Sequence, residues 1–236
     1  MRCDSYKDLF SKEYLMGPNS MRLLDELIEK YPIDTNLKIM DLGCGKGITS
    51  FFLSKEFNAN VYATDLWCSA TENYEQFKKW GIDNNVVPIH ADAHDLPYAN
   101  NYFDLITTID SFHYFSTEPG FFESKILPLV KSSGYVYIAM PGLKKEVHGK
   151  EDNLVLEWLG AEESEYELFH SIDWWKNHLN RSDLYELVDA FELTTGEKAW
   201  QDWFDSEHEY SASDKEYFAK GLNNYLNVIG FIIKKL

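Results

Sequence analysis

Three glycines at alternate positions follow an aspartate in the segment Asp41-Leu-Gly-Cys-Gly-Lys-Gly47. Glycine at positions 43, 45 and 47 lets the backbone take positive φ and lets a ligand approach without meeting a Cβ atom. The segment leaves an apolar run and enters a helical pattern, where the free N–H groups of a helix start favour a negatively charged ligand group. This composition predicts a turn that contacts a nucleotide-sized ligand.

The glycine spacing bears on which nucleotide is bound. A dinucleotide-binding turn of the form Gly-x-Gly-x-x-Gly needs its third glycine at position 48, which is Ile48 here. Asp41 precedes the turn, where its carboxylate would repel a pyrophosphate but attract an α-ammonium group. An NAD-dependent oxidoreductase is therefore the weaker alternative.

Two further aspartates follow the next two apolar runs. Asp65 lies 65 − 45 = 20 residues after Gly45, at the end of a predicted strand, where a carboxylate can bind both ribose hydroxyls. Asp92 ends the following strand and could accept a hydrogen bond from an adenine amino group. Since parallel strands end at the same edge of a sheet, these acids are expected to meet in one crevice and to bind an adenosyl ligand.

With these motifs, residues 20–140 resemble the class I (Rossmann-fold) S-adenosylmethionine-dependent methyltransferases, of a small-molecule type similar to the ubiquinone-biosynthesis group. The matching stretches are 39–47, 62–66, 91–97 and 102–113. The resemblance implies that Asp41 and residues 43–47 meet the methionine part of S-adenosylmethionine, Asp65 and Leu66 the ribose and adenine, and Asp92 and Ala93 the adenine ring. It also implies S-adenosylhomocysteine as the product. The predicted cofactor-binding residues are Tyr14, Asp41, Gly43, Cys44, Gly45, Gly47, Asp65, Leu66, Asp92, Ala93 and Asp110.

Methyl transfer from a sulfonium is an in-line displacement, so the protein must mainly align the acceptor, and a general base is optional. His113 follows the fourth predicted strand and is the candidate base, because an imidazole can remove a proton near neutral pH. The alternative is that His113 packs or orients the crevice. Asp110 is predicted to contact the cofactor or the acceptor, or else to cap the strand end.

Aromatic residues are the best sequence guide to the acceptor, because substrate pockets are mostly apolar with a few polar anchors. The predicted substrate-binding residues are Tyr114, Trp174, Trp200 and Trp203. Combined with the acids Asp202, Asp205, Glu162 or Glu163, such faces could hold a cationic amine. The alternative reading places most of these aromatics in a core and most of these acids on a solvated face.

The elements that must position these residues alternate in type. Apolar runs predict strands at 38–42, 60–64, 86–90, 103–108 and 135–140, then at 185–193 and 228–233, and helical patterns occur at 47–57, 69–80 and 118–130. A capping box at Ser213 predicts the start of a late helix. The prediction is an α/β, Rossmann-like, mostly parallel seven-stranded sheet with an antiparallel C-terminal strand. It forms one domain over 1–236, divided into an N-terminal helical lid (1–35), a cofactor-binding core (36–140), a helical insertion (141–182) and C-terminal strands with a helical insert (183–236).

The composition limits the kinds of molecule that the protein is expected to bind. A net charge of −17 opposes binding to nucleic acid and to anionic membranes. Three cysteines without CxxC spacing indicate neither a disulfide framework nor a metal site, and no apolar run is long enough for a membrane span, so a cytoplasmic protein is expected. The predicted function is methyl transfer to N or O of a small-molecule acceptor. A non-catalytic cofactor-binding module is the alternative from another class.

Overall fold

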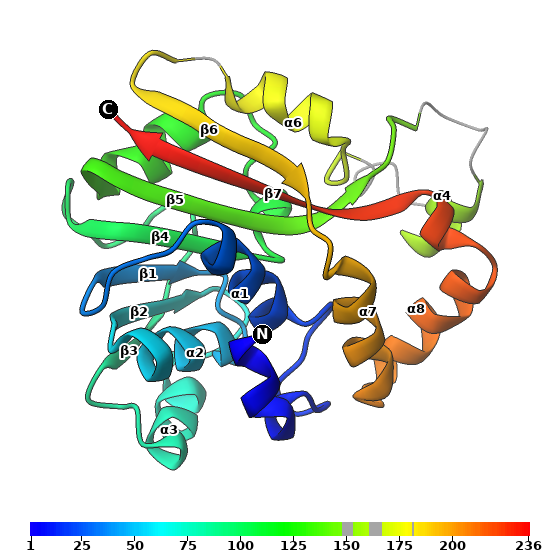
Figure 1. Ribbon diagram of the computed structural model, residues 1–236, viewed down its shortest axis with the longest axis horizontal. Coiled ribbons are helices and arrows are strands. Elements are labelled where there is room, and N and C mark those ends of the chain that lie inside the picture. The colour runs from blue at the N-terminus through cyan, green and yellow to red at the C-terminus, as the bar shows by residue number, and fades with distance from the viewer. Residues whose placement is uncertain (148–152, 161–166, 181) are drawn as a thin grey trace.

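Seven strands form one sheet in the order β3-β2-β1-β4-β5-β7-β6 (Figure 1). The strands are β1 (Lys38–Leu42), β2 (Asn60–Asp65), β3 (Val86–His90), β4 (Phe103–Ile109), β5 (Val130–Leu143), β6 (Tyr185–Glu192) and β7 (Leu226–Lys235). Strands β1 to β5 pair in parallel, whereas β7 runs antiparallel to both of its neighbours. The predicted mostly parallel sheet with an antiparallel last strand is confirmed. The computed structural model describes residues 1–147, 153–160, 167–180 and 182–236.

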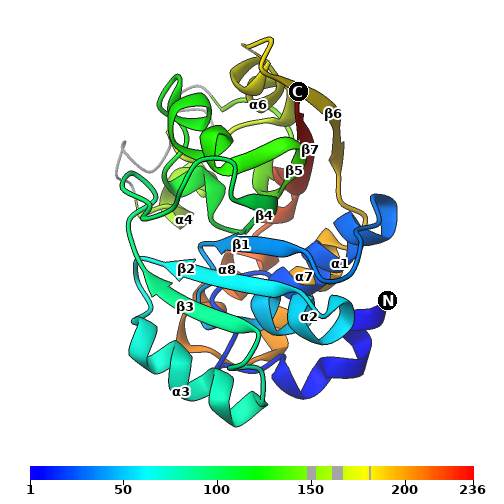
Figure 2. The same cartoon turned by 90° about the vertical axis from the view of Figure 1, so that its left-hand side faces the viewer.

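Helices cover both faces of this sheet (Figure 2). They are α1 (Ser20–Lys30), α2 (Ile48–Phe57), α3 (Ala70–Trp80), α4 (Asn153–Trp158), α6 (Ile172–Leu179), α7 (Gly196–Asp205) and α8 (Glu209–Ala219). Shorter turns are the 3-10 helices η1 (Arg2–Leu9), η2 (Phe112–Tyr114), η4 (Leu127–Leu129) and η5 (Leu222–Asn224), and the π-helical turn η3 (Phe122–Ile126). None of the helices in the described ranges is long and apolar enough to cross a membrane.

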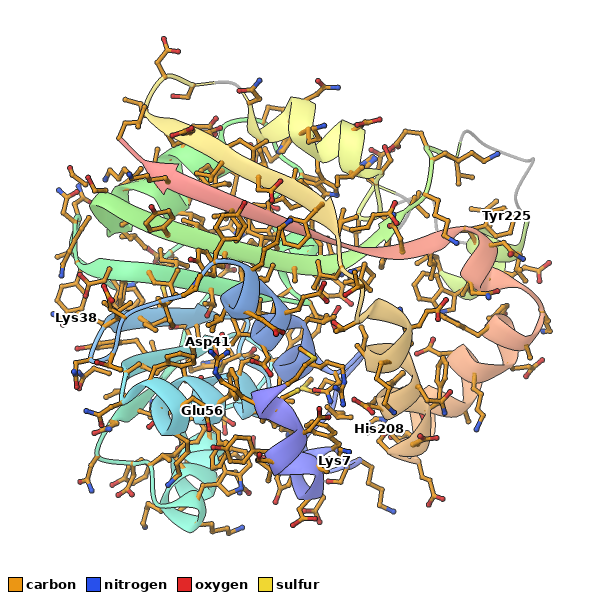
Figure 3. All side chains as sticks on the ribbon, viewed as in Figure 1. Lys7, Lys38, Asp41, Glu56, His208 and Tyr225 are labelled. Atoms are coloured by element: carbon orange, nitrogen blue, oxygen red, sulfur yellow. The ribbon has the colours of Figure 1, made fainter. Side chains whose placement is uncertain are left out.

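The core has two halves because successive strand residues face opposite sides of the sheet. Ile39 of β1 packs in the half that includes α1, α2, α3 and α7, whereas the next residue, Met40, packs in the half that includes η3, η4 and α6. Both side chains are fully buried. This alternation also decides the direction of Asp41, which shares the face of Ile39 and so points toward α2 (Figure 3).

Some elements differ from the sequence predictions. The helix expected at 118–130 is instead the turn η3 followed by η4, because Pro128 lacks the N–H that a continued helix needs. Ser213 does not begin a helix: α8 starts at Glu209, and His208 caps it by accepting a hydrogen bond from the backbone N–H of Tyr210. Helix α7 was not predicted as such. Of the predicted insertion, residues 148–152, 161–166 and 181 lie outside the described residues.

The N-terminal segment is fastened to the domain by a buried arginine. Arg22 of α1 donates to Asp202 of α7 at 2.7 Å and to Asp4 of η1 at 3.2 Å. The backbone N–H of Cys3 donates to Asp25 at 2.9 Å. These bonds join η1, α1 and α7, so the intervening residues are held near the carboxyl ends of the strands. The predicted lid role for residues 1–35 remains a prediction.

Candidate active site

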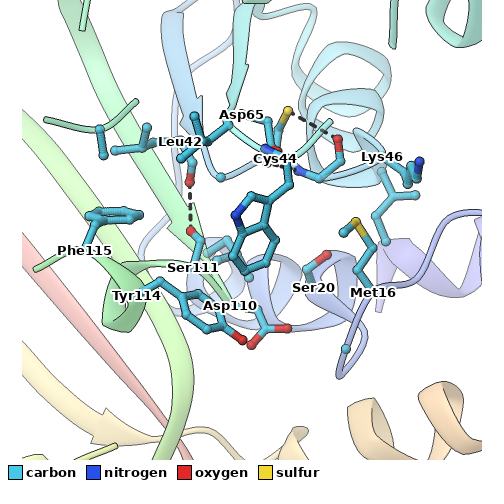
Figure 4. A pocket seen from close by; sticks show the side chains of 18 of the residues that line it. Met16, Ser20, Leu42, Cys44, Lys46, Asp65, Asp110, Ser111, Tyr114 and Phe115 are labelled. Carbon is cyan, nitrogen blue, oxygen red and sulfur yellow. Dashed lines mark hydrogen bonds between the residues drawn. The ribbon is translucent and has the colours of Figure 1, made fainter. Parts of the chain in front are cut away.

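A cavity of about 240 Å³ lies at the carboxyl ends of the parallel strands. This volume is slightly below the ~300–1,000 Å³ typical of ligand pockets. The sheet order changes direction at β1, which has β2 on one side and β4 on the other. Open α/β sheets bind ligands at this kind of switch point, since the loops leave adjacent strand ends in opposite directions. Figure 4 shows the resulting space, with Leu42, Cys44 and Asp65 above it and Met16, Ser20 and Asp110 around it.

The glycine turn forms one wall of this cavity. Gly43, Gly45 and Gly47 all have positive φ, at 75°, 53° and 83°. A Cβ on Gly43 would lie 2.2 Å from the Cβ of Ser111, and one on Gly47 would lie 2.4 Å from the ring of Phe77. Gly43, Cys44 and Gly45 line the cavity, whereas Gly47 caps the start of α2 and does not. The glycines are therefore needed both for backbone conformation and for space.

Asp65 supports this turn directly. Its Oδ2 accepts a hydrogen bond from the N–H of Gly45 at 2.8 Å, and its Oδ1 accepts from the N–H groups of Trp67 and Cys68 at 2.7 Å each. The side chain lines the cavity and is only 7% exposed. A carboxylate has about four lone-pair sites, so three backbone bonds leave room for one further donor on Oδ2.

Asp41 lies behind the turn and not in the cavity. Its Oδ2 accepts from Thr49 and Ser50 of α2, both at 2.6 Å, and its Oδ1 accepts from Thr107 of β4 at 3.1 Å. Burial raises the pKa of this carboxyl group, although the three hydroxyl donors oppose the shift. The structure therefore does not bring Asp41 to the position predicted for it, because strand alternation turns it toward α2 and joins the strand to that helix.

Asp92 and Ala93 line the opposite end of the cavity, with Leu66 of the loop after β2. Oδ1 of Asp92 accepts from the backbone N–H of His94 at 2.8 Å and pairs with its ring Nδ1 at 2.7 Å. These hydrogen bonds from His94 hold the pKa of Asp92 below its usual value. The carboxylate is thus kept ionised beside the cavity, with Oδ2 outside those bonds.

The loop after β4 forms the remaining wall. Ser111 donates to the carbonyl of Leu42 at 2.9 Å and also bonds Thr108, which ties the ends of β1 and β4 together. Asp110 and Tyr114 line the cavity, and their predicted contacts with the cofactor and the acceptor remain predictions. Asp110 has φ of 58°, a left-handed conformation that is uncommon outside glycine and concentrates at functional sites.

His113 is packed away from the cavity. Only 1% of it is exposed, and its ring lies 4.1 Å from that of Tyr114 and 5.0 Å from that of Phe169, measured between centroids. Its Nδ1 has no hydrogen-bond partner among the described residues. Burial lowers the pKa of His113 to about 3, so the ring is neutral and weakly basic at ordinary pH. This geometry favours the packing alternative over the predicted role as a base.

The three predicted substrate tryptophans are also packed elsewhere. Trp174 is stacked between two histidines of the α6 region, Trp200 lies against Phe218, and Trp203 donates its indole N–H to Asp214 at 2.8 Å. None of the three lines the cavity bounded by the described residues. Of the acids suggested for an amine, Asp202 pairs with Arg22, and Glu162 and Glu163 lie outside the described residues.

Much of the N-terminal wall of the cavity was not predicted from the sequence. Met16, Gly17, Pro18 and Ser20 line the cavity together with Tyr14, which was predicted. Trp67 was also missed, although it follows Asp65 by two residues. A signal was available for Trp67, because a large aromatic directly after a strand end is placed at the crevice. None existed for the N-terminal residues, whose position depends on the contacts of η1 and α1.

Comparison with known proteins agrees with this geometry. Residues 40–138 match the family model described as "Methyltransferase domain". The match lies within the predicted cofactor-binding core. The whole fold is similar to that of a S-adenosylmethionine-dependent methyltransferase from Geobacter sulfurreducens in complex with S-adenosyl-L-homocysteine, with a TM-score of 0.68 and 15% identity, covering 94% of each chain. The family resemblance inferred from the sequence is therefore confirmed.

Curated relatives match the methyltransferase domain over shorter stretches. "Methyltransferase GfsG" of Streptomyces halstedii is 30% identical over 91 residues, which is 38% of this chain and 33% of that protein. "Arginine-hydroxylase NDUFAF5, mitochondrial" of Homo sapiens is 29% identical over 131 residues, 55% of this chain and 35% of that protein. The chain spans about a third of the length of these curated relatives. Their names differ in reaction, so the domain alone does not fix the activity.

Proposed function

We propose that this chain transfers a methyl group from S-adenosylmethionine to a nitrogen or oxygen atom of a small molecule. The observation that carries the proposal is the convergence of the glycine turn, Asp65 and Asp92 on one cavity, with a separate polar wall at Asp110. A cofactor bound there supplies an electrophilic methyl group. The protein's part is to hold the cofactor and the acceptor in line and to keep water away.

The chain's residues fit the parts of this cofactor. Gly43 and Gly45 line the cavity where the methionine part would lie, and the absence of a Cβ at Gly45 leaves open the space between the turn and Met16. The remaining lone pair on Oδ2 of Asp65 suits a ribose hydroxyl. Oδ2 of Asp92 suits the adenine amino group, because His94 engages only Oδ1. Asp65 already occupies the N–H of Gly45, a backbone donor that a pyrophosphate at this turn would need, so this contact speaks against NAD.

Two measurements test the proposal. Calorimetry should detect binding of S-adenosylmethionine and S-adenosylhomocysteine, with no binding of NAD at the same concentrations. Incubation with methyl-labelled cofactor and a small-molecule extract should then give labelled product of low molecular mass. Binding without any labelled product would favour the non-catalytic module, and failure to bind either adenosyl compound would refute the proposal.

A further inference from the structure

Asp110 is the first residue after β4, and its carboxylate is directed to the N-terminal side of the cavity. A Cβ on Gly17 would lie 2.3 Å from Oδ2 of Asp110, so the absence of a side chain at Gly17 leaves room for this oxygen. The neighbouring Ser111 contacts the glycine turn instead, through Leu42 and Gly43. Asp110 therefore faces the N-terminal segment at Gly17, whereas Ser111 faces the turn that would hold the methionine part of the cofactor.

The carboxyl group of Asp110 is buried without a polar partner. No hydrogen-bond donor or cation of the described residues contacts its carboxylate, and Asp214 of α8 adds negative charge. Burial, and then the repulsion from Asp214, raise the pKa of Asp110 well above its usual value. Lys46 also lines the cavity, but its charge acts on Cys68 and Glu72, where it favours a lower pKa. An unpaired carboxylate in such a place is costly to the fold, and a cationic ligand would offset that cost.

Asp214 is itself held in place near this wall. It accepts one hydrogen bond from the indole of Trp158 at 2.7 Å and another from the indole of Trp203 at 2.8 Å. These two bonds fix the carboxylate without neutralising it. Asp214 is thus fixed close enough to act on Asp110, and its charge adds to the chain's net charge of −17 in attracting cations to this end of the cavity.

Two exposed aromatic rings stand at the same cavity. Trp67 follows β2 and Tyr114 follows β4, and their ring centroids are 5.1 Å apart with an angle of 65° between the planes. Trp67 is 67% exposed and Tyr114 is 45% exposed, and both line the cavity. Large exposed aromatics beside a pocket mark a surface for an apolar ligand, and their faces also attract cations.

We propose that Asp110 binds the methyl acceptor and that this acceptor is an amine carried on an apolar body, with the ammonium group at Asp110 and the body against Trp67 and Tyr114. The inference rests on the proposed function and narrows its substrate class. The ammonium group binds the ionised form of Asp110, whose own proton passes to water on binding, and donates hydrogen bonds to the carboxylate. Asp110 then takes one proton from the nitrogen onto its own oxygen, which leaves a neutral amine with a free lone pair. The raised pKa of the carboxyl group suits this proton transfer.

The test compares binding of cations and their neutral analogues to the protein, with and without S-adenosylhomocysteine. The probes are choline, its uncharged isostere 3,3-dimethylbutan-1-ol, and benzyltrimethylammonium, which adds an apolar ring. Calorimetry on the wild-type protein should show choline binding at least about tenfold tighter than the isostere, and benzyltrimethylammonium tighter still. Asp110→Asn should abolish the preference for charge, and Trp67→Ala should abolish the preference for the ring.

Asp173→Asn is the matched control, because this carboxylate belongs to α6 and its side chain is 84% exposed. It should leave all probe affinities unchanged. Asp110→Asn should also raise the melting temperature of the ligand-free protein by about 2–4 °C, because the native wild-type protein resists ionisation of this buried carboxyl group whereas the unfolded chain ionises it freely. Asp173→Asn should not raise it.

Each of the remaining outcomes would overturn either the role of Asp110 or the proposed function. Equal binding of choline and its isostere by the wild-type protein, or an unchanged preference in Asp110→Asn, overturns the inference. An equal loss of S-adenosylhomocysteine affinity in Asp110→Asn would assign the carboxylate to the cofactor and also overturn it. Failure of the wild-type protein to bind S-adenosylhomocysteine refutes the proposed function, and it is measured separately from the probes.

Discussion

Replacing Asp65 by alanine should damage both the fold and the cofactor site, because one carboxylate holds the backbone of two loops. Three N–H groups, those of Gly45, Trp67 and Cys68, lose their acceptor in this variant. Hydrogen bonds to a charged group each contribute about 1.5–3 kcal/mol, and they are not strictly additive. The free energy of unfolding should therefore fall by roughly 3–6 kcal/mol, a large part of the ~5–15 kcal/mol of a typical domain.

The variant Asp65→Asn separates the hydrogen bond from Gly45 from those of Trp67 and Cys68. Its oxygen can still accept from Trp67 and Cys68, but its NH₂ group would face the N–H of Gly45, so one bond is replaced by two opposed donors. Asp65→Asn should thus lose about 1–3 kcal/mol and keep the loop after β2. Both variants should bind S-adenosylhomocysteine at least about tenfold more weakly, which corresponds to ~1.4 kcal/mol.

Urea unfolding followed by circular dichroism gives the stability, and calorimetry at 10 °C on the folded fraction gives the affinity. The reasoning fails if Asp65→Ala loses less than about 1 kcal/mol of stability, since the three backbone bonds would then contribute nothing. If Asp65→Asn binds S-adenosylhomocysteine as tightly as the wild-type protein does, Asp65 does not bind the ribose.

Three further predictions follow from single residues. Gly43→Ala should lose at least about 2 kcal/mol more stability than Gly81→Ala, because both have positive φ but only the first meets a side chain within 4 Å; urea unfolding of the pair measures the difference. His113→Phe should leave the pH profile of methyl transfer unchanged. It should also reduce the loss of stability as pH falls from 6.5 toward 3, because the native ring resists a proton that the unfolded chain accepts; thermal melts across this range test it. The stability advantage of Asp110→Asn should grow as pH rises above 3.8, since the native carboxyl holds a proton that the unfolded chain releases. An advantage that shrinks instead would contradict the burial of this carboxyl group without a polar partner.

Local patterns in the sequence predicted the sheet well, for a physical reason. Strands of such a sheet are short runs rich in apolar residues between turns, and all seven runs predicted as strands became strands. The glycine turn could also be read directly, because positive φ at Gly43, Gly45 and Gly47 is a property of the chain itself. The spacing from Gly45 to Asp65 is fixed by one helix and one strand, so it too is visible without a structure.

The direction of individual side chains was harder to predict. Asp41 was expected in the cavity, although strand alternation from the buried Ile39 places it toward α2, a conclusion that the sequence could have supported. The burial of His113 could not be foreseen in this way, since it depends on the turn η2 and on Phe169, which is distant in the chain.

The sequence by itself determined the strands, the turn and the aspartates at the strand ends, because these depend on residues close together in the chain. Only the tertiary structure decided which distant segments complete the cavity. Gly17 faces Asp110 because Arg22 joins η1 and α1 to Asp202 of α7, and Asp214 charges the same wall from α8. Packing between segments far apart in sequence sets these positions, and no local pattern encodes it.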